Sequence, residues 1–211
     1  MKKFLIFILS IIIMQPVSAK NIQGVWHNDL RTLFQHNNAI INTINIRTFN
    51  AKDTNSNEII DKDEESGNFI NAIDELDNLV KQGINTIHVL PITPVGKIKA
   101  FGTAGSLYAI SSFTDINPQL VSKTSSLSGI EQAKRFIREC HKRDIRVIID
   151  LPSCGSYDMF VEHPEYYMKD ENQNPIIPLD WTDVRLLNCG TEHKLNDDLL
   201  TLHKKFIDML I

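Results

Sequence analysis

The chain has 211 residues, and its 26 acidic and 22 basic side chains give a formal net charge of −4. A nucleic-acid-binding face needs clustered basic residues, and no long run of Lys or Arg occurs, so nucleic acid is excluded as a partner. The three cysteines are too few for a disulfide scaffold. The length that follows the amino-terminal segment fits one domain.

Residues 1–19 have the pattern of a secretory signal peptide. Two lysines precede an apolar run from Phe4 to Met14, and a small-residue cleavage pattern ends at Ala19. The run is about half of the ~20 residues that span a bilayer. We therefore expect cleavage and export, to the periplasm or the extracellular space, with no stable membrane anchor; an uncleaved anchor is the alternative.

An amino-terminal extension over residues 20–39 leads into alternating strands and helices. A β-rich run predicts a strand over 40–49, and a polar loop separates it from a helix over 69–82 with Gly83 at the C-cap position. An apolar strand follows directly and stops at Pro91. His88 lies inside this strand and is expected to be a packed, hydrogen-bonded core residue.

The same order then repeats after a long loop over residues 91–126. Ser128 and Glu131 have the spacing of a capping box, which marks the start of a second helix. Cys140 falls on the apolar stripe of that helix and is expected in the core. A strand over 145–150 follows, and then another long loop. A third helix, from about Leu195, has an apolar stripe at helical spacing: Leu195, Leu199, Leu202 and Phe206.

This alternation of strands and helices predicts an α/β fold with parallel strands and right-handed crossovers. Long loops on the carboxyl side of the strands favour a (β/α)8 TIM barrel, of which residues 40–211 would form an incomplete portion, the first three βα units. A doubly wound open sheet is the alternative. No G-x-G-x-x-G follows any strand, so the usual mark of a dinucleotide site is missing.

The polar loop after the first strand has the spacing of an EF-hand-like calcium loop. Oxygen-bearing side chains stand at positions one, three, five, nine and twelve: Asp53, Asn55, Asn57, Asp61 and Glu64. Position six, where glycine makes the sharp turn, is Glu58, which favours a solvated loop over a calcium site. The histidines show no zinc-binding spacing, so no other metal or cofactor is expected.

Four stretches in order resemble the α-amylase family, glycoside hydrolase family 13. They are NFINAIDELDNLVKQGINTIHVLPITP, AISSFTDINPQL, AKRFIRECHKRDIRVIIDLP, and the pair HPEYYMKDENQNP and DWTDVRLLN. The resemblance covers about residues 40–211. It implies a retaining glycosidase, hydrolase or transglycosylase, whose partner is an α-glucan or a maltooligosaccharide.

The resemblance implies a substrate-binding role for Asp150, at the end of the third strand, and for Tyr108 in GSLYAI. The alternative for Asp150 is a carboxylate that holds loop backbone N–H groups. Tyr108, Trp181 and Trp26 have the aromatic faces that stack on sugar rings, although the large area that an aromatic side chain buries favours core packing for each. The same resemblance relates Asp53, Asn55, Asn57 and Asp61 to the calcium ligands of some family members.

No catalytic residue is assigned within the chain. The family's signature Asn and His after the strand-end aspartate fall on Cys154 and Gly155, and its nucleophile, acid and supporting carboxylates lie on the fourth, fifth and seventh strands. We therefore expect a glycosidase truncated before these carboxylates and inactive without a completing polypeptide. The alternatives are a non-catalytic remnant and a small carbohydrate-binding or structural module.

Two pairs of loop residues carry further expectations. Asp150 with Asp158, and Asp180 with Asp183, are carboxylates that flank loops and are expected to be solvated rather than catalytic. Cys154 and Cys189 also lie in predicted loops, where they could pair as a disulfide in an oxidising compartment.

Overall fold

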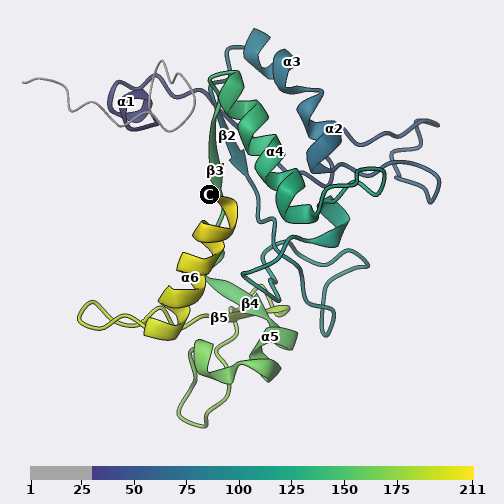
Figure 1. The fold of residues 1–211 in the computed structure, drawn as a ribbon. Coiled ribbons are helices and arrows are strands. Elements are labelled where there is room, and N and C mark those ends of the chain that lie inside the picture. The colour runs from purple at the N-terminus through teal and green to yellow at the C-terminus, as the bar shows by residue number, and fades with distance from the viewer. Residues whose placement is uncertain (1–29) are drawn as a thin grey trace, which may run out of the picture.

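The computed structural model describes residues 30–211 (Figure 1). The predicted signal peptide, Trp26 and the first part of the extension over 20–39 lie outside the described residues. The rest of that extension contains a short helix, α1 (Leu30–Gln35). Within residues 30–211, no helix is both long enough and apolar enough to cross a membrane.

The centre of the fold is a parallel sheet of three strands in the order β1-β2-β3. The strands are β1 (Ile41–Ile44), β2 (Thr86–Val89) and β3 (Arg146–Ile149). This confirms the predicted α/β fold with parallel strands. The first strand is shorter than predicted, because the backbone turns at Asn45, whose carbonyl accepts hydrogen bonds from the N–H groups of Thr48 and Phe49.

The predicted helix over 69–82 is two short helices, α2 (Phe69–Ile73) and α3 (Leu76–Lys81). Within the second helix, Leu79 is buried whereas Val80, which is spaced with Phe69, Ile73 and Leu76 as one helical stripe, is exposed. Gly83 follows with the left-handed φ of 81° that a C-cap glycine supplies.

Helix α4 (Gly129–Lys142) starts at the predicted capping box. The Ser128 hydroxyl accepts from the Glu131 N–H at 3.3 Å, and the Glu131 carboxylate accepts from the Ser128 N–H at 2.8 Å. The helix packs on α2, where the Phe136 ring lies 6.0 Å from the Phe69 ring. Cys140 is fully buried, as predicted.

Helix α6 (Asp197–Leu210) starts at the N-cap Asn196 and contacts α4. Leu199 and Phe206 are buried and Leu202 is half-buried, as the predicted stripe requires. Leu195 is an exception, because it precedes the helix and is exposed.

A second unit, which the sequence analysis did not predict, lies beyond the carboxyl ends of the parallel strands (Figure 1). Strands β4 (Cys154–Ser156) and β5 (Val184–Leu186) pair antiparallel, and helix α5 (Tyr157–Glu162) follows β4 directly. Residues 30–211 also contain two 3-10 helices, Pro118–Leu120 in the loop after β2 and Pro164–Tyr166 after α5.

Close approach of backbone and side chain fixes β4 in place. The Tyr167 hydroxyl donates to the Ser156 carbonyl at 3.2 Å, and a Cβ at Gly155 would overlap that hydroxyl. Glycine is therefore required at position 155. A separate hydrogen bond, from the Ser156 N–H to the Ile110 carbonyl at 2.8 Å, ties the β4–β5 unit to the loop after β2.

Candidate functional site

A pocket of about 570 Å³ opens at the carboxyl end of β3. Its volume lies in the range of about 300–1,000 Å³ that small-molecule sites occupy. The loop after β2, the loop after β3 and strand β5 all contribute to it. The lining residues are Phe101, Ser106, Tyr108, Asp150, Leu151, Pro152, Ser153, Cys154, Trp181, Asp183 and Val184. The structure thus brings together Tyr108, Asp150 and Trp181, the three side chains that the sequence analysis proposed for substrate binding.

Asp150 joins the sheet to the loop after β2. Its N–H donates to the Val89 carbonyl at 3.0 Å, and its Oδ2 accepts from the Tyr108 hydroxyl at 2.6 Å. The hydrogen bond to the carboxylate holds the phenol in its protonated form and raises the pKa of Tyr108 to about 12. Tyr108 and Asp150 therefore form one hydrogen-bonded unit at the pocket.

His88 lies beside this unit and is not the core residue that the sequence suggested. Its ring is half-buried, with Nε2 3.7 Å from Asp150 Oδ2 and Nδ1 3.3 Å from the Thr43 hydroxyl. The parallel register explains the position, because Thr43, His88 and Ile148 are partners across the three strands and Asp150 follows β3.

Two exposed aromatic rings belong to the pocket lining. Trp181 is 66% exposed and Phe101 is 54% exposed, so core packing, the alternative for Trp181, is wrong. Phe101 was not predicted, because nothing in KAFGTAG distinguishes it from an ordinary loop residue. Gly102 and Gly105, with φ values of 62° and 70°, shape this loop.

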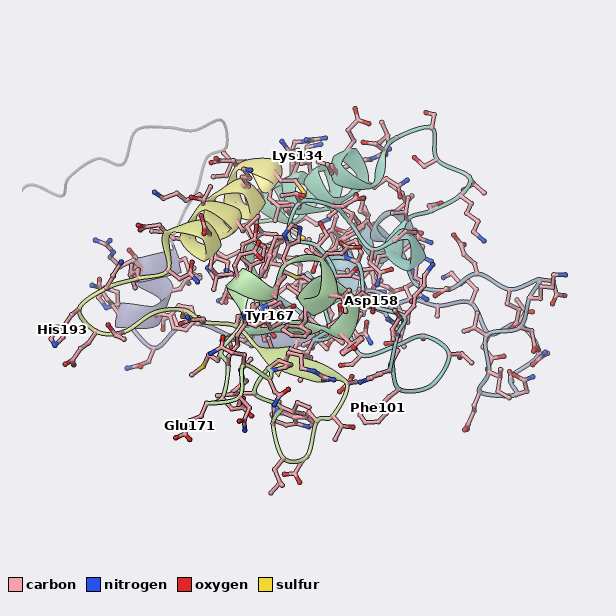
Figure 2. The ribbon with its side chains drawn as sticks, turned by 90° about the horizontal axis from the view of Figure 1, so that it is seen from below. Phe101, Lys134, Asp158, Tyr167, Glu171 and His193 are labelled. Atoms are coloured by element: carbon pink, nitrogen blue, oxygen red, sulfur yellow. The ribbon has the colours of Figure 1, made fainter. Side chains whose placement is uncertain are left out.

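Asp158 holds the loop that carries Phe101. Its Oδ2 accepts from the backbone N–H groups of Lys97 and Ile98 at 2.9 and 3.0 Å. Phe101 and Asp158 lie on the same side of the molecule in Figure 2. The expectation that Asp158 is a freely solvated carboxylate is therefore wrong; it is an anchor between α5 and the loop.

Asp183 also departs from the expectation of a solvated loop carboxylate. It is only 3% exposed, while Asp180 three residues earlier is exposed. The difference arises because Asp183 immediately precedes β5, whose first residue Val184 pairs with Ser156 of β4. The sequence did not predict this burial, because β4 and β5 have only three residues each and are too short to show a strand pattern.

The three cysteines are free thiols in the structure, so the suggested Cys154–Cys189 disulfide is not formed. Cys154 lines the pocket and donates to the Tyr108 carbonyl at 3.4 Å. Burial, with a further contribution from the charge of Asp183, raises the pKa of Cys154 to about 11. Cys189 is exposed.

The loop over 53–64 folds around its own polar side chains, away from the pocket. Glu64 accepts from the Asp61 N–H at 3.0 Å and from the Thr54 hydroxyl at 2.7 Å, and these hydrogen bonds lower its pKa to about 2. The side chains of Asn55 and Asn57 donate to Asp61 Oδ2 at 2.9 and 3.0 Å. The ends of the predicted calcium motif are therefore brought together.

The donor set of this loop fits a hard cation such as calcium, which takes oxygen ligands. Asp53, Asn55, Asn57, Asp61 and Glu64 would hold the ion. Glu58, at the position usually taken by glycine, adopts a φ of 64°, so the turn forms without the glycine. Among residues 30–211, no group of three or more His, Cys, Asp or Glu side chains has a metal-binding arrangement, so amide oxygens would be needed here.

No family model matches the chain. The maize (Zea mays) protein isoamylase SU1, chloroplastic, is 25% identical over 133 residues, which are 60% of this chain and 16% of the maize protein. An α-amylase from Lactobacillus plantarum is 25% identical, with a TM-score of 0.61 over 83% of this chain and 36% of that structure. The catalytic module of SpuA, described as a pneumococcal glycogen-degrading virulence factor, is 20% identical, with a TM-score of 0.60 over 82% of this chain and 26% of that module's chain, and shows the fold alone.

These similarities confirm the resemblance to the α-amylase family that the sequence indicated. The chain spans well under half the length of each of these proteins. The matched relatives carry names of α-glucan-acting glycosidases, and the shared fold is α/β.

Replacing Asp158 by alanine is predicted to release the loop that carries Phe101. If the two lost hydrogen bonds together contribute about 1.4 kcal/mol, the open form becomes about tenfold more populated. Trypsin cleavage at Lys97 and Lys99, followed by mass spectrometry, measures this directly. Glu162→Ala, on the exposed end of the same helix, is the control and should cleave like the wild type; equal rates for Asp158→Ala would contradict the anchoring role.

Proposed function

The chain resembles the α-amylase family, and from that premise we propose that it supplies part of the substrate site of a retaining glycosidase that acts on α-glucans, by hydrolysis or transglycosylation. The observation that carries the proposal is that Tyr108, Asp150 and Trp181 line one and the same pocket. A mostly apolar pocket with a few polar groups and exposed aromatic rings suits a sugar, which has apolar faces and a hydroxyl-bearing edge.

Each side chain has a distinct task in this proposal. Trp181 and Phe101 offer aromatic faces to the apolar side of a pyranose ring. Asp150 accepts a hydrogen bond from a sugar hydroxyl with the carboxylate oxygen that Tyr108 does not use. Tyr108 fixes the direction of that carboxylate, and its raised pKa keeps the hydroxyl a hydrogen-bond donor throughout the neutral range.

We further propose that the parallel sheet is the first part of a (β/α)8 barrel. Retaining catalysis needs two carboxyl groups about 5–5.5 Å apart, one of them a free nucleophile. Asp150 does not fit that role, because it is committed to Tyr108 and lies beside His88. In the barrel that the family resemblance implies, the nucleophile and the acid come from further strands. A carbohydrate-binding module without chemistry is the second candidate, and the same pocket supports it. Turnover of maltoheptaose by the chain together with a polypeptide that supplies the further barrel strands distinguishes the two.

We also propose that the protein is exported, because residues 1–19 have the pattern of a signal peptide. A mature protein that starts at Lys20 and is recovered from the periplasm or the medium would support it. Recovery of the uncleaved chain from the cytoplasm would contradict it.

Replacing Trp181 by alanine is predicted to raise the Kd for maltoheptaose about tenfold, because the loss of a stacking face costs about 1.4 kcal/mol of binding. Isothermal titration calorimetry measures the Kd. Leu179→Ala is the matched control, since Leu179 lies on the same loop, is 92% exposed and does not line the pocket. Equal losses in both variants, or none in Trp181→Ala, would contradict the stacking role.

We also propose that the loop over 53–64 binds calcium and is stiffened by it. Asp53→Asn is predicted to weaken calcium binding at least about tenfold, because a charged oxygen ligand is replaced by a neutral one. Asp63→Asn removes the same charge from a position that is exposed and outside the ligand set, so it should change the Kd by less than about twofold. Calorimetric titration with calcium checks both. No heat of binding at millimolar calcium in the wild type would remove the proposal.

A further inference from the structure

Asp183 is a buried carboxylate whose hydrogen-bonding capacity is not used by the protein. The residue is 3% exposed, and its Oδ2 is closed off from solvent with no hydrogen-bond partner. Burying a charged group without compensation is unfavourable, so such groups in proteins are paired, hydrogen-bonded or bound to a ligand. Asp183 also belongs to the pocket lining, and its Oδ1 is not among the closed-off atoms, so a ligand that enters the pocket can reach the carboxylate through that oxygen.

The neighbouring cation does not neutralise Asp183. Arg185, two residues along the chain, is fully buried, but its Nη1 donates to the carbonyls of Thr182 and Val184 at 2.9 and 2.8 Å. Its guanidinium lies over the Tyr157 ring at 5.2 Å. Among residues 30–211, no ion pair to Asp183 is formed.

The surroundings of Asp183 identify the chemistry of the missing partner. The pocket lining combines this carboxylate with that of Asp150, the hydroxyls of Ser106 and Ser153, and the Trp181 ring. A carboxylate accepts hydrogen bonds, so the partner must be a donor. An aromatic face beside acceptor oxygens matches a neutral polyol ring, which offers hydroxyl donors at its edge and C–H groups on its face.

We propose that Asp183 is a specificity-determining residue that accepts hydrogen bonds from hydroxyls of the sugar ring held in this pocket. This inference rests on the proposed function and extends it. Asp150 follows β3 and Asp183 immediately precedes β5, and both line the pocket. Because a buried acceptor is costly to leave unpaired, a ring that lacks the matching hydroxyl binds poorly.

The test compares Asp183→Asn with the wild type in two measurements. The first is the Kd for maltoheptaose, which we predict to rise at least tenfold in the variant. The second is the melting temperature without sugar, which we predict to be unchanged or higher, since the substitution removes an unpaired buried charge and keeps the side-chain shape. Asp180→Asn, three residues away and exposed, is the control and should leave both quantities unchanged.

The two measurements separate the outcomes. A lower melting temperature in Asp183→Asn would overturn the inference and assign Asp183 a structural role. An unchanged Kd in Asp183→Asn would overturn the inference as well. The proposed function would still stand in that case, provided that the wild-type protein binds maltoheptaose. A wild-type protein that does not bind maltoheptaose would overturn both.

Discussion

The short hydrogen bond from the Tyr108 hydroxyl to Asp150 is the contact on which the site depends. The Asp150 N–H donates to the Val89 carbonyl of β2, and the Asp150 carboxylate accepts from the Tyr108 hydroxyl in the loop after β2. Asp150 therefore fixes the position of this loop relative to the sheet. The loop is fixed a second time by Asp158, which binds the N–H groups of Lys97 and Ile98. A pocket built largely from loops is thus held in shape by two carboxylates that accept from defined donors.

The regular part of the fold could be predicted because it follows from periodicity and capping. The stripe that ends at Phe206, the box from Ser128 to Glu131 and the C-cap at Gly83 each have a local cause that is visible in the sequence. The break between α2 and α3 was missed, because the apolar residues on both sides of Asp74 fit one continuous stripe. Helix propensity alone did not show that the segment forms two short helices, α2 and α3, whose buried faces do not form one continuous stripe.

The site could be predicted only in part. Tyr108, Asp150 and Trp181 carry chemistry that the family resemblance makes recognisable, whereas Phe101 and Asp183 acquire their places through long-range contacts. The pairing of β4 with β5 buries Asp183, and strands of three residues are too short to leave an alternating pattern. Glu58 stands where an EF-hand loop has glycine, so the sequence argued against a sharp turn there. The turn forms nevertheless, with a left-handed φ at Glu58, because the Asp53 carboxylate accepts from the Glu58 N–H at 2.8 Å.

The central claim is that a sugar occupies the pocket beside Asp150, and Cys154 reports on that occupancy. Cys154 is a free thiol in the pocket lining, while Cys189 is free and exposed outside it, so the second cysteine is an internal control. Alkylation by iodoacetamide is followed at both residues by mass spectrometry, with and without maltoheptaose. The account predicts that the sugar slows alkylation of Cys154 and leaves that of Cys189 unchanged. Equal rates at Cys154 with and without saturating sugar would contradict it.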